Sequence, residues 1–119
     1  MARFEMTVRD GPRVSRIRGD SIDELFLAVE LHVELLSGRA DAKPATALFR
    51  EFEPIEQVVA RVEISRRRGR FGRRDRAGID VRGDGSVEAY RGRANRKLIE
   101  PWPGESAVTA LRRAFDADS

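Results

Sequence analysis

A capped and strongly apolar helix is the segment that most constrains the fold of this chain. Residues 21–24 (Ser-Ile-Asp-Glu) form a capping box, in which a serine and a glutamate three residues later satisfy backbone groups at a helix start. The pattern predicts a helix from Ile22 to about Leu36, with Gly38 ending it. Alternation over residues 29–35 is also typical of a strand, but the capping box, the length and the Leu/Glu/Ala content favour a helix.

Apolar residues occupy two sides of this predicted helix. With about 100° between successive residues, one stripe consists of Ile22, Leu25, Phe26, Val29, His32, Val33 and Leu36. A second stripe on nearly the opposite side consists of Leu27, Leu31 and Leu35, and a narrow polar strip consists of Asp23, Glu30 and Glu34. A helix this apolar either lies at the centre of its domain or packs its second side against another chain. We therefore expect the second stripe to form an oligomer interface, most simply in a homodimer.

The segments around the helix predict an antiparallel sheet. Residues 4–8 alternate between apolar and polar, and the turn-forming residues 10–12 (Asp-Gly-Pro) follow, which predicts a first hairpin that returns to about Gly19. Asp84-Gly85 lies between two further alternating segments, residues 79–81 and 87–90, and predicts a second hairpin. Its returning strand could run on towards residues 98–99.

The remaining segments are less regular. Residues 39–54 have the composition of a connector with a short helical turn around residues 45–52. Residues 55–65 show both helical and strand spacing, and their β-branched content favours a strand from about 57 to 65. A short amphipathic helix is expected from about 105 to 115.

The predicted fold is α+β: an antiparallel sheet of about four or five strands in the order β-β-α-connector-β-β-β-α. We expect the long helix to lie across one face of the sheet and the short C-terminal helix to pack at an edge.

Length and composition set the class of protein. A chain of 119 residues has the size of one domain, and 40% hydrophobic with 36% charged residues suits a globular protein. We expect a single domain over residues 1–119, with a mobile basic loop at about residues 66–77. No apolar run is long enough to cross a bilayer and the N-terminus has no signal-peptide pattern, so we expect a cytoplasmic protein without a membrane partner.

Several kinds of catalytic chemistry lack the residues that they need. The chain has no cysteine and one histidine, which removes disulfides, thiol nucleophiles and imidazole-rich metal sites. The histidine, His32, is expected to pack in the core or at an interface. We assign no catalytic, cofactor-binding or metal-binding residue and do not expect an enzyme. A small-molecule pocket lined by Asp80, Tyr90 and Arg91 would favour one.

Basic residues are concentrated in the middle of the chain. Residues 61–97 carry 13 basic and 5 acidic side chains, whereas residues 1–60 carry 8 and 11, and residues 98–119 carry 2 and 4. The net charge of +3 therefore contains a local charge of +8 between two acidic flanks. A concentrated positive field favours a negatively charged partner. The predicted contact residues are Arg66, Arg67, Arg68, Arg70, Arg73, Arg74 and Arg76, with Phe71 available to stack on a base.

These observations support two functional hypotheses. The first is a non-catalytic binding module whose arginine-rich hairpin contacts a polyanion, most plausibly nucleic acid. The second is a homo-oligomeric protein–protein interaction module, such as an adaptor, an assembly subunit or a toxin-neutralising partner, whose basic patch docks an acidic protein. Two structural alternatives stay open for the arginines: a solvated loop of an arginine-rich protein, or pairing with the chain's own acidic helix strip.

Overall fold

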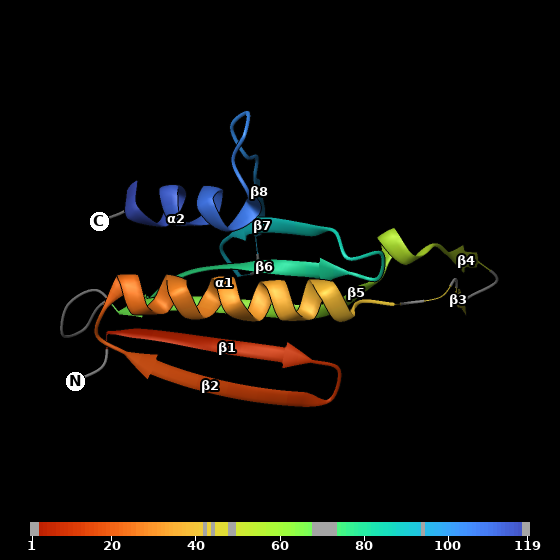
Figure 1. Cartoon of the computed structure of the whole chain (residues 1–119), viewed down its shortest axis with the longest axis horizontal. Helices are drawn as coiled ribbons and strands as arrows, with labels where there is room; N and C mark the ends of the chain where they lie inside the picture. The colour runs from red at the N-terminus through yellow and green to blue at the C-terminus, as the bar shows by residue number, and fades with distance from the viewer. Residues whose placement is uncertain are drawn as a thin grey trace.

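The computed structural model describes residues 3–41, 43, 45–47, 50–67, 74–93 and 95–117 (Figure 1). The elements in chain order are β1 (Phe4–Asp10), β2 (Arg13–Gly19), α1 (Ile22–Arg39), β3 (Ala45–Ala47), β4 (Arg50–Phe52), η1 (Pro54–Glu56), β5 (Val58–Arg67), β6 (Arg74–Arg82), β7 (Val87–Arg91), β8 (Lys97–Ile99) and α2 (Ala107–Ala117). Within this described part, six strands form the main sheet in the order β2-β1-β5-β6-β7-β8, with every neighbouring pair antiparallel. The α+β prediction is confirmed, although the sheet has more strands than expected.

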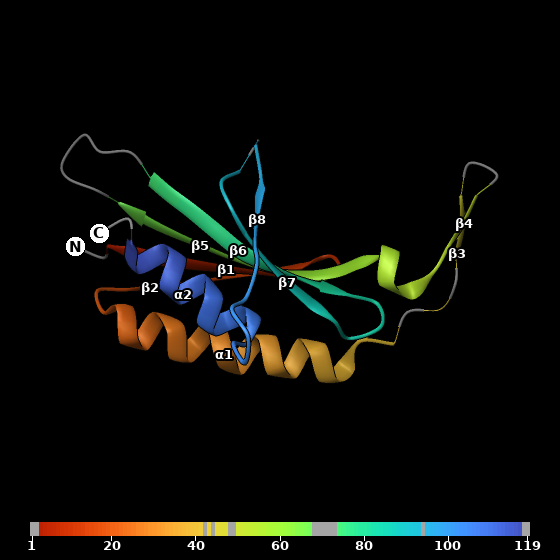
Figure 2. The ribbon, with the colours of Figure 1, turned by 90° about the horizontal axis from the view of Figure 1, so that it is seen from above.

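Both helices cover the same face of the main sheet (Figure 2). The α1 residues that pack into the core are Leu25, Phe26, Val29, Val33 and Leu36, all from the first predicted stripe. The C-terminal helix contributes Leu111 and Phe115, and the rings of Phe26 and Phe115 meet edge to face with centroids 5.9 Å apart. Neither described helix is both long and apolar enough to cross a membrane.

Ser21 caps the start of α1 as predicted, because its hydroxyl accepts a hydrogen bond from the Glu24 backbone N–H at 3.3 Å. The helix does not end at Gly38 but continues to Arg39. Contacts outside the helix hold this last turn. The Ser37 hydroxyl donates to the Gly85 carbonyl at 2.5 Å, and Arg39 pairs with Asp10 at 2.6 Å.

Both predicted hairpins are present. β1 and β2 pair along their whole length around a turn in which Gly11 has φ of 60°. β6 and β7 pair around a turn in which Gly85 has φ of 89°. These left-handed conformations favour glycine, which explains why the Asp-Gly pairs at residues 10–11 and 84–85 predicted the two turns. The strand prediction for residues 57–65 is also confirmed, by β5.

Two predictions for local structure are wrong. The expected helical turn around residues 45–52 is the small hairpin β3–β4, which extends beyond the end of the main sheet (Figure 1). Strand pairing gives hydrogen-bond partners to backbone N–H and C=O groups that one isolated helical turn would leave without them.

The strand expected to run on from residue 87 towards residues 98–99 ends at Arg91 instead. Gly92, with φ of 86°, lies in the connection that turns the chain back, so that β8 pairs antiparallel with β7.

The structure also differs from the loop expected over residues 66–77, because both ends of this segment are strands. β5 extends to Arg67 and β6 begins at Arg74, and these two residues are paired. Residues 66–67 and 74–77 therefore belong to strands because the antiparallel ladder continues into the segment. Residues 68–73 lie outside the described residues.

Candidate anion-binding site

The candidate site lies on the face of the main sheet opposite the helices, which we call the open face. Successive side chains of a strand point to opposite faces of a sheet. The apolar residues of β1 pack under the helices, so Glu5, Thr7 and Arg9 point to the open face. By the same alternation, Ser65 of β5 and Arg76 of β6 point there and are paired across the two strands.

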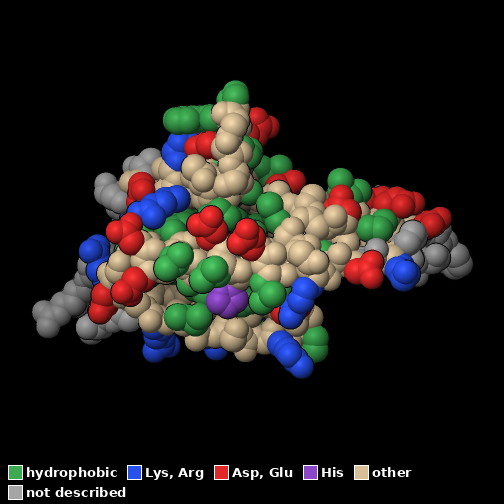
Figure 3. Space-filling view, viewed as in Figure 1, with side chains coloured by type: hydrophobic (Ala, Val, Ile, Leu, Met, Phe, Trp, Pro, Cys, Tyr) green, Lys and Arg blue, Asp and Glu red, His purple; other side chains and the backbone are tan. Residues whose placement is uncertain are grey.

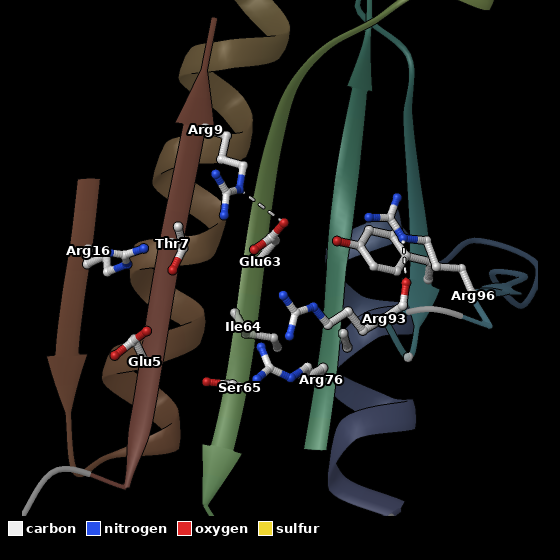
Figure 4. A pocket seen from close by; sticks show the side chains of 13 residues that line it. Glu5, Thr7, Arg9, Arg16, Glu63, Ile64, Ser65, Arg76, Arg93 and Arg96 are labelled. Carbon is white, nitrogen blue, oxygen red and sulfur yellow. Dashed lines mark hydrogen bonds and ion pairs between the residues drawn. The ribbon is translucent and has the colours of Figure 1, made fainter. Parts of the chain in front are cut away.

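A depression of about 260 Å³ is hollowed into the open face (Figure 4). It spans β2, β1, β5 and β6 and is bordered by the loop that follows β7. The charged side chains that line it are Arg9, Arg16, Arg76, Arg93, Arg96, Glu5 and Glu63. Guanidinium groups therefore outnumber carboxylates in the depression.

Both carboxylates of the depression already have a partner. Glu63 Oε1 accepts from Arg9 Nε at 3.2 Å, and Glu5 Oε2 accepts from Arg18 Nε at 3.0 Å. Arg96 also has a partner, because its Nη1 lies 3.9 Å from Asp80 Oδ2. Three arginines of the depression, Arg16, Arg76 and Arg93, remain without an ion pair to any described residue.

Two of these three guanidinium groups converge. Figure 4 shows Arg76 of β6 and Arg93 of the loop after β7 extending from the same side towards β5, where Arg76 ends beside Ser65 and Arg93 beside Ile64. Arg16 extends from β2 towards Thr7. Like charges in one place repel each other unless an anion lies between them. Guanidinium forks bind phosphate or carboxylate bidentately, and the hydroxyls of Thr7 and Ser65 can add hydrogen bonds from the floor.

Tyr90 forms part of the depression wall together with charged neighbours. Its ring lies under the Arg96 guanidinium, with 4.6 Å from Arg96 Cζ to the ring centroid, and Arg61 Cζ is 5.7 Å from the same centroid. Burial raises the pKa of the Tyr90 hydroxyl to about 12, although the charge of Arg61 acts in the opposite direction. Tyr90 is therefore a neutral phenol near pH 7, not a nucleophilic phenolate.

Arg61 is held by Asp80, whose Oδ1 lies 2.6 Å from Arg61 Nε. Partial burial acts to lower the pKa of Arg61, but the hydrogen bond and the charge of Asp80 outweigh it and raise the pKa. The positive charge of Arg61 is thus neutralised within the fold.

The predicted contact residues differ in where the structure places their side chains. Arg67, Arg74 and Arg76 have exposed side chains on the open face. Arg74 donates to the Ser65 hydroxyl at 3.2 Å. The four predicted residues that lie outside the described residues are Arg68, Arg70, Phe71 and Arg73.

The prediction that Arg66 is an exposed contact residue is wrong. Strand alternation turns its side chain towards the helices, where it is only 4% exposed. There Arg66 Nη2 pairs with Asp75 Oδ2 at 3.1 Å and also donates to the Phe115 carbonyl at 3.1 Å. In this position the guanidinium is used within the fold and does not face a ligand.

Sequence reasoning missed several residues of the depression, among them Arg16, Arg93 and Arg96. Arg93 and Arg96 fall inside the basic segment, but they are separated from its densest part, and Arg16 lies in the acidic N-terminal part. Arg16 lies in a predicted strand, but the apolar residues of that strand do not show which way its side chain points, because Val14 shares its alternation and Ile17 does not. Which strands lie side by side could not be inferred from that pattern.

The second predicted surface is the leucine stripe of α1. Leu27, Leu31 and Leu35 are 60%, 58% and 54% exposed, in agreement with an outward-facing second stripe. Figure 3 shows these hydrophobic side chains grouped along α1 around His32, with acidic side chains beside them. The His32 Nδ1 lies 2.8 Å from the Ala28 carbonyl, so the ring packs against its own helix.

The residues that would have favoured an enzyme are not brought together. Asp80 and Tyr90 belong to the open face, whereas Arg91, the next residue after Tyr90 in β7, points to the opposite face. Within the described residues, no group of three His, Asp or Glu side chains is arranged to hold a metal ion.

No protein-family model, curated protein or solved structure matches the chain.

Proposed function

We propose that this protein is a non-catalytic nucleic-acid-binding module whose open face and β5–β6 hairpin contact the phosphate backbone. The observation that carries the proposal is that Arg16, Arg76 and Arg93 share one depression without an ion pair to any described residue. A phosphate among them would replace repulsion between like charges with charge-assisted hydrogen bonds. Arg67 and Arg74 extend the basic surface towards the hairpin tip.

The distribution of charge over the molecule supports this proposal. The acidic strip of α1 lies on the helix side of the sheet, away from the open face (Figures 2 and 3). One member of that strip, Asp23, is paired with Arg112 of α2 instead of with an arginine of the depression. The strip therefore does not neutralise the three unpaired arginines, and the open face keeps a positive field that attracts polyanions.

The proposal is tested by binding to single-stranded DNA and RNA over a series of salt concentrations. Affinity should fall steeply with salt, because bound arginines release counterions from phosphates. The triple variant Arg16→Ser/Arg76→Ser/Arg93→Ser should reduce the slope of log affinity against log salt by about two. No retention on any nucleic acid at low salt would contradict the proposal.

A matched triple variant controls for the loss of net charge. Arg13, Lys43 and Lys97 are exposed and lie outside the depression, so Arg13→Ser/Lys43→Ser/Lys97→Ser removes the same formal charge elsewhere. This variant should change the slope much less. If the two triple variants reduce the slope equally, binding depends on the total charge of the protein and not on the arginines of the depression.

A second candidate function is a homo-oligomeric interaction module, such as an adaptor, an assembly subunit or a toxin-neutralising partner. It is favoured by the leucine stripe of α1, because three leucines that are more than half exposed in one row are costly in water. In this candidate the basic open face docks an acidic protein. The two candidates are compatible, since a dimer would carry two basic faces.

A further inference from the structure

The wall of the depression carries a planar cation that lies over the face of an aromatic ring, an arrangement that we call the Arg96–Tyr90 stack. The Arg96 guanidinium lies 4.6 Å above the Tyr90 ring centroid, and the Arg96 side chain is 34% exposed. Arg96 lines the same depression as Arg76 and Arg93 (Figure 4). A planar, partly exposed group therefore lies beside the unpaired guanidinium groups.

Several contacts hold this stack in place. The Arg96 Nε donates to the Arg93 carbonyl at 3.3 Å, and Arg96 Nη1 lies 3.9 Å from Asp80 Oδ2. Under the stack, Tyr90 lies so close to Gly78 that a Cβ on this glycine would come 2.5 Å from the Tyr90 hydroxyl. The ring and the guanidinium are thus positioned before any ligand arrives, which reduces the entropy lost on binding.

Stacked arginine is a platform for flat rings. Guanidinium groups stack on nucleobases as well as on aromatic side chains, and every base has a π-face. A base would form the third layer of the stack, after Tyr90 and Arg96. In a duplex, the faces of the bases are covered by neighbouring base pairs, so only an unpaired base can reach this platform.

We infer that the ligand of the open face is single-stranded nucleic acid, with one phosphate between Arg76 and Arg93 and an adjoining base stacked on Arg96. This inference rests on the proposed function and adds the class of ligand to it. Stacking tolerates any base, so the module binds single strands with little sequence preference.

The test compares three oligonucleotide ligands of equal length at one salt concentration: an intact single strand, an abasic single strand with the same phosphates, and a duplex. The intact strand should bind at least about fivefold more tightly than the abasic strand, which is the lower limit for stacking of one base. The intact strand should also bind more tightly than the duplex.

A variant at Arg96 tests whether its guanidinium group causes the preference for the intact strand over the abasic strand. Arg96→Lys keeps the positive charge but removes the planar group, so the preference for the intact strand should fall at least threefold. Affinity for the abasic strand should stay within about twofold. Arg13→Lys, an exposed position outside the depression, makes the same chemical change and should alter neither affinity.

The outcomes separate this inference from the proposed function. Equal, salt-dependent binding of intact and abasic strands would overturn the base platform but leave a phosphate-binding module. Tighter binding of the duplex, or an undiminished preference in Arg96→Lys, would likewise overturn it. Failure of every nucleic acid to bind at low salt would end both proposals.

Discussion

Arg66 is stacked on Phe115 in the interior of the protein, with Arg66 Cζ 4.5 Å from the ring centroid. The same guanidinium pairs with Asp75 of β6 and donates to the Phe115 carbonyl of α2. One side chain of β5 thus joins β6 and the C-terminal helix at the base of the arginine-rich hairpin. An arginine that looks like part of the basic surface in the sequence is a structural residue.

Arg66→Ala should lower the free energy of unfolding by about 3 kcal/mol, because it removes an ion pair to Asp75 and a buried hydrogen bond to the Phe115 carbonyl together. Urea denaturation followed by circular dichroism measures the change. Arg76→Ala, one residue beyond Asp75 but on the open face, is the matched control and should change stability by less than about 0.5 kcal/mol. Similar losses in both variants would contradict the buried position of Arg66.

Gly78→Ala should destabilise the sheet by about 1 to 3 kcal/mol through overpacking. A Cβ at Gly78 would lie 2.5 Å from the Tyr90 hydroxyl and 2.7 Å from the Val62 carbonyl, which belongs to the neighbouring strand backbone. Gly19→Ala serves as control, because a Cβ there meets no atom within 4 Å. If both substitutions are tolerated equally in thermal denaturation, the close packing of Tyr90 on Gly78 is wrong.

Tyr90 should ionise at unusually high pH. Its pKa is raised to about 12 from an ordinary value of 10.0, mainly because burial disfavours the phenolate. Since Tyr90 is the chain's one tyrosine, the ultraviolet absorbance of the phenolate reports on this residue alone. A midpoint near 10 in the folded protein would contradict the described environment.

The same pKa makes stability depend on pH in a defined window. The folded state holds the Tyr90 proton more tightly than the unfolded state, so the stabilisation is complete below pH 10 and is lost as pH rises towards 12. We expect a loss of about 1 to 2 kcal/mol, since the site opens onto water that screens part of the effect. Tyr90→Phe should remove this part of the pH dependence in urea denaturation.

Leu31→Glu should convert a dimer into a monomer if the leucine stripe is an oligomer interface, because it places a charge in an apolar contact. Light scattering of the wild type and the variant measures the mass. Leu98→Glu, which alters an equally exposed leucine on β8, should leave the dimer intact. A wild-type protein that is already monomeric at high concentration would remove the second candidate function.

Local signals explain why much of the fold could be predicted. The Ser21 cap, and the glycines at 11 and 85 with positive φ, act within a few residues, so their consequences are visible in the sequence. The leucine stripe of α1 was predicted for the same reason, because helical periodicity alone decides which residues share a side. The small hairpin β3–β4 and the edge strand β8 were missed, since each has short strands stabilised by a pairing partner and not by its own pattern.

The sequence by itself determined how many arginines the chain has, that they cluster between residues 61 and 97, and that a capped helix must cover a sheet. Only the tertiary structure decided which arginines are internal, which are neutralised and which are available to a ligand. Arg66 and Arg67 are neighbours in the chain, yet one is buried and the other exposed, because a strand turns successive side chains to opposite faces. Arg16 and Arg76 share a depression only because the strand order places β1 and β5 between β2 and β6. Strand order and register arise from long-range pairing, which no local pattern of residues encodes.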